Sequence, residues 1–534
     1  MKKKIYTVAL ALLSLSGFTG CSESFLDLSN PSALSPSAFP SKMADMETLV
    51  NAVYALVNRY ELYGAELLIK GPFITDHTCD MAWTADDSWN QLARNDIQSS
   101  NGMIQNIWYG YYAVIGGCNT LLEEVEKFEA RGNLQAEEQT RLSQMRGEGL
   151  FWRGWAHQQL VQFWGEGYPC NGDGDKQGVP LRLSVVTADN MNAARNTVNE
   201  VYAQVLKDYE EAATLLPSSW DGESNRSRVT SYAAKSYMGQ ANLFMGNYDK
   251  AKQYLKEVID GPGKSLLPFN EYKDMFNDKQ VKFNNESILE LNFKASSGAS
   301  SQGNTWSGGE CTSISKFIAF CYLNAEGISV AGAWSNVFFH DANIERFGSD
   351  PRLAVCALAP GTPVIANGVN TVIGKYIDVE ENIKGWSLGK YNPVSFTPTE
   401  VSYKVGINAY LMRLAEVYLM YAEASFSAGD ETTAREYLNK VRRRAYQGDT
   451  SHDITASGTQ LRDAIREERF LELFGEGVQH WIDVCRWKTL DQEIAKWYKT
   501  TRVGDPHYDA WDLYYPIPKK ELEDNPEIKQ STGY

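Results

Sequence analysis

An internal repeat constrains the fold of this chain more than any other feature. The segments AKSYMGQANLFMGNYDKAKQYLKEVID (234–260) and AEVYLMYAEASFSAGDETTAREYLNKVRRRA (415–445) carry small and apolar residues at the same spacings. The matching positions are Gly239, Gly246, Ala251 and Leu255 in the first segment and Ala422, Gly429, Ala434 and Leu438 in the second. Because glycine readily ends a helix, each segment is predicted to form two helices joined at its glycine. The small residues at the first matching pair allow the two helices to approach closely.

The repeat resembles the tetratricopeptide unit, a helix-turn-helix of about 34 residues that stacks into a solenoid. Two units cannot cover their own apolar ends, so more helices are needed. Apolar residues at helical spacing recur at 46–63, 104–128, 142–165, 197–216 and 459–487. We therefore expect a mainly α protein, with a tetratricopeptide-like helical repeat scaffold of about four helix pairs.

The stretch 262–405 differs from its surroundings. It contains a Ser/Gly-rich loop at 296–310, frequent Pro and Gly from 351 to 398, and short β-rich pieces such as SILELNF at 287–293. These features indicate an inserted, irregular and partly β subdomain. Because helical repeats resume after it, scaffold and insert are expected to form one interleaved unit.

The N-terminus has the order of a secretory signal: Lys2, Lys3 and Lys4, an apolar run of about Ile5 to Leu15, and then small residues. The run is too short to span a bilayer, which takes about 20 residues. Thr19-Gly20-Cys21 looks like the end of a bacterial lipobox, in which the cysteine becomes the lipidated N-terminus. The alternative is a plain secretory signal with an incidental cysteine. In both cases the protein leaves the cytoplasm.

The expected organisation follows from these segments: a lipoprotein signal peptide (1–20), a lipidated N-terminus and flexible tether (21–37), N-terminal helical repeats with loop insertions (38–261), an irregular ligand-binding insert (262–405), and a C-terminal helical repeat with a closing segment (406–534).

The formal net charge is −16. Nucleic acid is therefore an unsuitable partner, because binding it requires basic patches that neutralise phosphates. An acidic surface also repels anionic lipids, so membrane attachment would depend on the acyl chains of Cys21.

No motif supports catalysis. The sequence GWSLG at 385–389 matches a nucleophile elbow, but polar residues and Pro393 flank it where that motif needs a strand and a helix. The six histidines show no HExxH and no metal-ligand spacing. Glu467, Glu468 and Arg469 lie in a charged helix and are expected to be solvated or paired with Arg466. We expect a protein that is not an enzyme.

Asp173 and Asp175 in NGDGDKQG alternate as in a calcium loop, yet Lys176 replaces the expected glycine and no glutamate closes the loop at Arg182. A polar turn is the favoured interpretation, with calcium as the alternative, and no other cofactor is expected.

Among the cysteines, a Cys311–Cys321 disulfide is one option, and most of the others are expected to be buried thiols.

Tryptophans outside the amphipathic helices give the positive functional signal. Those inside, Trp152, Trp155, Trp164, Trp481 and Trp487, are expected in the core. A large ring on a polar loop needs a cover, and the flat face of a sugar provides one, with nearby polar groups binding its hydroxyls. The alternative is that each ring fills the insert's own small core. The predicted ligand-binding residues are Trp83, Asp86, Trp89, Asn90, Trp306, Trp334 and Trp386.

Several segments together resemble the SusD/RagB family of outer-membrane lipoproteins. They are RLAEVYLMYAEA, LNKVRRRA, LRDAIREERFLELFGEG, IDVCRW, the C-terminal YYPIPKKELEDNPEIKQSTGY, and CSESFLDLSNPSAL after the signal. The resemblance covers essentially the whole mature chain and departs from the family at Gln479 and His480, where a basic residue often follows the EG pair. It implies four tetratricopeptide-like units with a ligand-bearing insert, and a surface-exposed, lipid-anchored protein that binds glycan for nutrient uptake.

The resemblance also implies a partner, a SusC-like TonB-dependent transporter over which the protein acts as a lid. The leading hypothesis is therefore binding of oligosaccharide or polysaccharide and its delivery to that transporter. The first alternative is a helical-repeat protein that binds peptide or protein cargo at the same transporter. The second is a secreted glycosidase, which would use two carboxylates across its bond.

Overall fold

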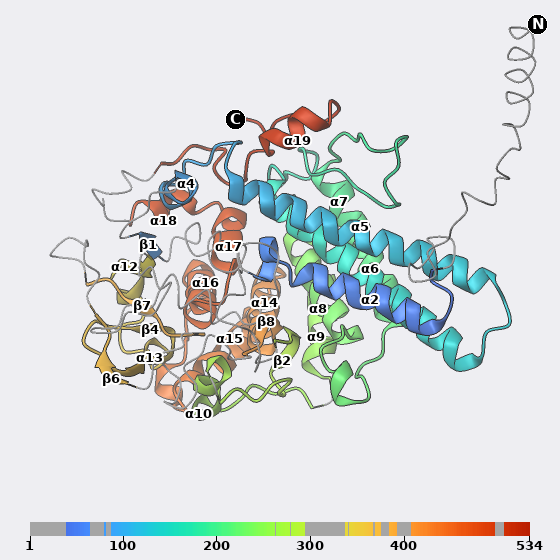
Figure 1. The fold of residues 1–534 in the computed structure, drawn as a ribbon. Helices are drawn as coiled ribbons and strands as arrows, with labels where there is room; N and C mark the ends of the chain where they lie inside the picture. Colours follow the sequence, from blue (N-terminus) through green and yellow to red (C-terminus); the bar gives the residue numbers. More distant parts are fainter. Residues whose placement is uncertain are drawn as a thin grey trace, which may run out of the picture. The chain divides into compact units, whose positions relative to one another are not determined.

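The computed structural model describes residues 39–64, 79–81, 87–261, 263–277, 279–293, 337–339, 341–366, 369–374, 384–391, 407–496 and 507–534. The chain divides into two units, Met1–Thr48 and Leu49–Tyr534. The architecture below is that of the second unit, drawn in Figure 1. Its described part is mainly helical with small two-stranded sheets, which confirms the prediction of a mainly α protein with a partly β part.

The N-terminal half contains ten helical segments among the described residues. They are α2 (Met43–Val57), η2 (Tyr60–Gly64), α4 (Asp87–Arg94), α5 (Gly102–Ala130), α6 (Ala136–Trp164), η4 (Pro169–Asn171), α7 (Val198–Leu215), η5 (Glu223–Asn225), α8 (Ser231–Met245) and α9 (Tyr248–Ile259). From α5 to α9 each helix packs on the next, as Figure 1 shows. Side chains cap several of these helices: Asn101 accepts hydrogen bonds at the start of α5, and Thr197 forms a capping box with Glu200 on α7.

The C-terminal half contains α14 (Leu414–Ser427), α15 (Glu431–Ala445), η9 (Thr450–His452), α16 (Gly458–Leu473), α17 (Gln479–Trp487), α18 (Leu490–Ile494) and α19 (Lys519–Asp524). Helix α14 packs on α15 and α16, and also on α9. The two repeated helix pairs therefore lie directly against each other, although the insert separates them in the sequence.

The repeat positions have the roles that their residue types predict. A Cβ atom at Gly239 of α8 would lie 2.5 Å from the Leu255 side chain of α9, so a larger residue would force that side chain to shift. Gly246 follows α8 with φ 79°, and Gly429 follows α14 with φ 83°, a left-handed conformation that suits glycine at the end of a helix.

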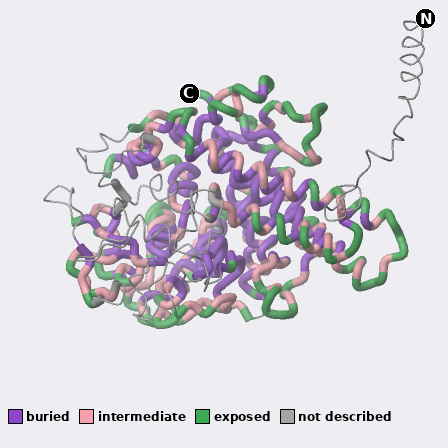
Figure 2. The backbone as a smooth tube through the Cα atoms, in the orientation of Figure 1, coloured by how far each residue is buried: buried purple, intermediate pink, exposed green. Residues whose placement is uncertain are grey.

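The core of the helical part is rich in aromatic rings. Trp152, Trp155, Trp164 and Trp481 are fully buried, as predicted. The rings of Trp152 and Trp155 meet edge to face at 5.3 Å, and those of Phe163 and Trp481 stack at 5.3 Å. Figure 2 shows the buried backbone running through these helices. Trp487 differs from its prediction: it is half-buried at the end of α17 and lines a surface pocket.

The insert is built from short elements. Its helices are α10 (Phe269–Tyr272), η6 (Lys273–Phe276), α12 (Asp341–Glu345) and α13 (Leu353–Cys356). Its strands are β2 (Ser287–Leu291), β3 (Val337–Phe339), β4 (Ala357–Leu358), β5 (Pro363–Ala366), β6 (Val369–Val372) and β7 (Ser387–Leu388), and two strands outside it are β1 (Cys79–Met81) and β8 (Ala409–Arg413). All pairs are antiparallel: β1 with β3, β2 with β8, β4 with β7, and β5 with β6.

Two of these pairs join the insert to segments far away in the sequence. Strand β1 comes from the N-terminal half, and β8 leads directly into α14. The predicted strand in SILELNF is confirmed as β2. Scaffold and insert are thus connected through backbone hydrogen bonds as well as through side chains.

Candidate ligand-binding site

A narrow sheet brings together three segments that contain or adjoin predicted ligand-binding residues. Strand β1 pairs with β3 in the register Cys79↔Phe339 and Met81↔Val337. On the other side of β3, the Phe339 N–H donates to the Trp386 carbonyl at 2.8 Å, and the Trp386 N–H donates back to Phe339 at 3.3 Å. The N-terminal half, the insert strand and the Trp386 segment therefore form one small platform.

Phenylalanine side chains fix this platform on the C-terminal helices. The rings of Phe339 and Phe474, which follows α16, lie 4.4 Å apart, and Phe474 also meets Phe347 and Phe470 at 5.3 Å each. Gly475 adopts φ 76°, and a Cβ atom there would lie 2.7 Å from the Leu388 side chain of β7. The platform thus rests on a rigid apolar support.

The structure describes three of the seven predicted ligand-binding residues. Trp386 is half-buried beside β7. Trp89 and Asn90 lie on α4, and Trp89 is only 3% exposed. The expectation that Trp89 sits on a loop is therefore wrong. The sequence held a signal for this helix, since Asp87 at its first position and Arg94 at its last both suit the helix dipole. The remaining four lie outside the described residues: Trp83, Asp86, Trp306 and Trp334.

A buried cluster of charges connects the insert to α16. Glu468 and Glu472 are four residues apart on α16 and so share a helical face, and Glu476 follows in the turn after the helix. Glu472 binds Arg352 of the insert at 2.9 Å and Arg413 of β8 at 2.6 Å, and it also pairs with Arg444 of α15. Burial opposes ionisation of Glu472, but Arg444, Arg413 and Arg352 outweigh it and hold its pKa well below the usual range.

This cluster corrects the sequence interpretation of Glu468 and Arg469. Both are 1% exposed, so they are not solvated. Glu468 pairs with Arg352 at 2.7 Å and Arg442 at 3.0 Å, while Arg469 pairs with Asp483 at 2.7 Å. Their partners come from other elements, so nothing local revealed them. The spacing of like charges four apart was the available signal, because such a face is unfavourable without cations opposite it.

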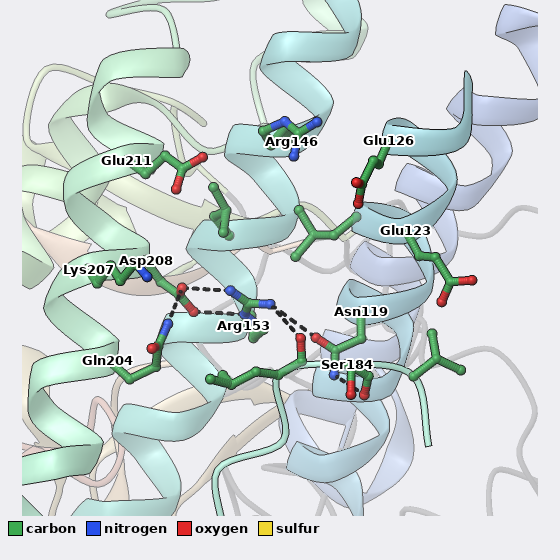
Figure 3. Close-up of a pocket in the computed structure, with 14 residues that line it drawn as sticks. Asn119, Glu123, Glu126, Arg146, Arg153, Ser184, Gln204, Lys207, Asp208 and Glu211 are labelled. Atoms are coloured by element: carbon green, nitrogen blue, oxygen red, sulfur yellow. Dashed lines mark hydrogen bonds and ion pairs between the residues drawn. The ribbon is translucent and has the colours of Figure 1, made fainter. Parts of the chain in front are cut away.

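A cavity of about 440 Å³ lies between α5, α6 and α7 and was not predicted. At its base the Arg153 guanidinium donates to both Asp208 carboxylate oxygens at 2.9 and 2.7 Å and to the Asn119 side chain at 3.2 Å, as Figure 3 shows. The rim carries charged side chains from the three helices: Glu123, Glu126, Arg146, Lys207 and Glu211. No aromatic ring lines this cavity, so it lacks a platform for stacking a sugar.

The calcium candidates lie in a polar turn. The Asp173 carboxylate is paired with Lys176 at 2.9 Å and Lys488 at 3.0 Å, and Asp175 accepts a hydrogen bond from Asn199 at 3.3 Å. Within the described ranges, no group of three or more His, Cys, Asp or Glu side chains has the arrangement of a metal site. Two lysines on one carboxylate favour the turn interpretation over calcium, because they supply the charge that the cation would.

The described cysteines and the GWSLG motif lie in surroundings that suit a structural role and not a catalytic one. Cys118, Cys356 and Cys485 are buried free thiols, as expected, whereas Cys311 and Cys321 lie outside the described residues. Ser387 is fully buried on β7, and a turn rather than a helix follows it at Lys390 and Tyr391. The local geometry is thus not that of a nucleophile elbow.

Comparison with known families covers nearly the whole chain. Residues 24–243 match a SusD-like family described as starch-binding and associating with the outer membrane, and residues 273–534 match the family described as SusD family. The chain belongs to the SusD family. Within its described residues, no helix has both the length and the apolar character needed to cross a membrane.

Individual SusD relatives agree with this assignment along their full lengths. SusD-like protein P2 of Formosa agariphila is 25% identical, with 100% of each chain covered. A SusD-like protein from Bacteroides fragilis matches in structure with a TM-score of 0.73 and 20% identity, covering 94% of this chain and 99% of that one. Surface glycan-binding protein A from Bacteroides thetaiotaomicron, solved with laminarihexaose, matches with a TM-score of 0.70 and 19% identity over 91% of this chain and 99% of that one.

Proposed function

We propose that this protein is a surface-exposed, lipid-anchored outer-membrane protein that binds oligosaccharide or polysaccharide and delivers it to a SusC-like TonB-dependent transporter. Membership of the SusD family supports glycan binding and association with the outer membrane. A relative with the same fold was solved with laminarihexaose. Cys21 would carry the lipid, and the segment 21–37 would tether the protein beside its transporter. In this role the protein binds its ligand and does not turn it over.

The observation that carries the glycan proposal is the register of the platform. Met81 pairs with Val337, so the last residue of β1 and the first residue of β3 lie at the same end of the sheet. Trp83 follows Met81 by two residues, and Trp334 precedes Val337 by three. Trp386 lies across β3 from β1. Trp386 is therefore the predicted tryptophan that the described residues place on the platform, while Trp83 and Trp334 lie outside those residues.

The chemistry of these residues suits a neutral, hydroxyl-rich ligand. Indole rings offer flat apolar faces, and carboxylate or amide groups such as Asp86 and Asn90 bind hydroxyls. A chain with a net charge of −16 gives no long-range attraction to anionic polymers. Laminarihexaose is the first probe, because a relative was solved with it.

Substitution of Trp386 by alanine tests the platform. If its ring stacks on a sugar, laminarihexaose or the best ligand of a polysaccharide panel should bind with about 1–3 kcal/mol less free energy, the magnitude known for bases stacked on aromatics. This is roughly a tenfold to hundredfold weaker Kd, which isothermal titration measures. The matched control is Trp220→Ala, since Trp220 is also half-buried but lies near α8 and donates to Val229. Equal affinity of the Trp386 variant and wild type would refute the site.

Delivery to the transporter needs a separate measurement. The protein should copurify with a SusC-like transporter from detergent-solubilised outer membranes. Failure to copurify, with glycan affinity intact, would reject the delivery role and leave the binding role standing.

A second candidate function is binding of peptide cargo at the same transporter. The cavity between α5, α6 and α7 favours it, because its charged rim suits an extended peptide better than a neutral glycan. Titration with a peptide library should then show binding that Lys207→Glu weakens and Trp386→Ala leaves unchanged. Absence of peptide binding at millimolar concentrations would eliminate this candidate.

A further inference from the structure

A small pocket on the C-terminal part of the helical scaffold is lined by arginines. It has a volume of about 150 Å³ and lies where α14, α16 and α17 meet η4 and the start of α9. Its lining includes Asn171, Tyr248, Ser427, Arg462, Arg466 and Trp487. Arg486 and Glu423 form its inner wall. We call it the Arg466 pocket.

The carboxylate on the inner wall is already engaged. Arg486 donates to both oxygens of Glu423 at 2.6 and 2.9 Å, and the Trp487 indole N–H donates to the same carboxylate at 2.9 Å. Burial opposes ionisation of Glu423, but the Arg486 charge and hydrogen bonds outweigh it and lower its pKa to about 2. The carboxylate is thus ionised and matched by Arg486.

The other charges around the pocket are matched as well. Asp483 is shared between Arg469 at 2.7 Å and Arg486 at 2.9 Å, and Arg462 binds the neighbouring Asp463 at 2.8 Å. Cys170 stays a neutral thiol, because burial raises its pKa. Arg466 is the remaining charged side chain that lines the pocket.

Arg466 has no carboxylate partner in the described part of the chain. Its guanidinium lies over the Trp487 ring at 4.8 Å, and no described residue forms an ion pair or hydrogen bond with it. Burial lowers its pKa, and the attraction of Glu423 offsets only part of that effect. A half-buried charge of this kind is unfavourable unless it is paired. Among the described residues, the pocket therefore holds a positive charge without a counterion, in a protein whose net charge is −16.

We propose that the Arg466 pocket binds an oxyanion, namely a carboxylate, sulfate or phosphate group. Arg466 supplies the charge, and its planar guanidinium, which lies over the Trp487 ring, carries N–H groups in the fork geometry that such groups accept. Ser427, Tyr248 and Arg462 provide further donors on the pocket wall. The small volume admits one anionic group and not a polymer. The anion is either a free ion or a substituent on a sugar, and this site is independent of the glycan platform.

Thermal unfolding at constant ionic strength tests the proposal. Wild-type protein should show a Tm that rises and saturates as sodium chloride is replaced by sodium sulfate or phosphate, because a ligand of the folded state stabilises it by mass action. Isothermal titration should give one site. Arg466→Gln should raise the Kd at least tenfold, whereas Arg443→Gln, an exposed arginine of α15 paired with Asp453, should leave it unchanged. Equal responses of wild type and Arg466→Gln would overturn the proposal.

The variant also separates binding from a structural role. In sodium chloride alone, Arg466→Gln should unfold at the same temperature as wild type or a higher one, because it removes an unpaired half-buried charge. A lower Tm in that buffer would mean that the arginine serves packing on Trp487, and would overturn the proposal.

The dissociation constants of several probes distinguish the two sources of the anion, a free ion and a substituent on a sugar. Glucose 6-sulfate and glucuronate are titrated beside inorganic sulfate, with glucose as the neutral control. A Kd for a sugar anion at least tenfold below that of sulfate identifies a glycan substituent, and the reverse order identifies a free ion. Both results support the site, while binding of glucose as tight as that of its anionic derivatives contradicts it.

Discussion

Replacing Glu472 by glutamine would remove the charge at the centre of the cluster that joins the insert to the helical scaffold. The carboxylate is fully buried and faces Arg352 at 2.9 Å, Arg413 at 2.6 Å and Arg444. Breaking a buried ion pair by removing one partner costs about 3–5 kcal/mol, because the other charge stays buried without compensation. Glu472 pairs with three arginines, each of which keeps at least one other carboxylate partner, so we expect a loss within this range in the free energy of unfolding.

Equilibrium unfolding in urea, followed by tryptophan fluorescence, measures this loss as a lower midpoint. The control is Glu436→Gln on α15, whose ion pair with Lys440 is exposed. Exposed pairs contribute roughly 0–1 kcal/mol, so this variant should unfold like wild type. A Glu472→Gln midpoint within experimental error of the control would show that the cluster does not hold the insert, and would refute the reasoning.

The same substitution should change the dependence of stability on pH. The folded pKa of Glu472 lies below its ordinary value of 4.5, so its contribution is complete above that pH and is lost as the pH falls further. Wild-type protein should therefore lose stability on acidification below pH 4.5, and Glu472→Gln should show a shallower decline. Identical slopes would contradict the assigned direction of the shift.

Two further predictions concern single residues. Trp89→Ala should lower the stability by about 3–5 kcal/mol, as truncation of a buried tryptophan does, because its ring is 3% exposed; an unchanged urea midpoint would show that the ring has no role in the core. Cys21→Ala should release the protein into the soluble fraction with unchanged glycan affinity, and palmitate labelling that persists in the variant would exclude Cys21 as the lipidation site.

The fold class was readable from the sequence because its signals are local. Apolar residues at helical spacing marked α5, α6, α7 and both repeated helix pairs, and Gly246 and Gly429 marked the ends of α8 and α14. Such patterns depend only on neighbours along the chain and on the 3.6-residue period of a helix. The strand β2 was visible for the same reason, as a short β-rich piece between turns.

The candidate sites were less accessible, because they combine residues that are distant in sequence. Trp386 was correctly singled out as a tryptophan outside the helices, but nothing local indicated that its backbone pairs with Phe339. Trp89 was misplaced, since the helix around it is short and begins beside residues that resemble a polar loop. The Arg466 pocket was missed entirely, because its lining comes from five separate elements.

The sequence by itself determined which segments are helical, that the two repeats have the same construction, and that the N-terminus resembles an exported lipoprotein. Only the tertiary structure decided which charges are buried and which segments meet. It pairs Cys79–Met81 with Val337–Phe339, and it places Glu468 and Glu472 against Arg352. The physical reason is the distance along the chain over which each interaction acts. Helix formation is governed by residues three or four apart in the sequence. The desolvation and pairing of a charge depend instead on the side chain that the fold brings opposite it.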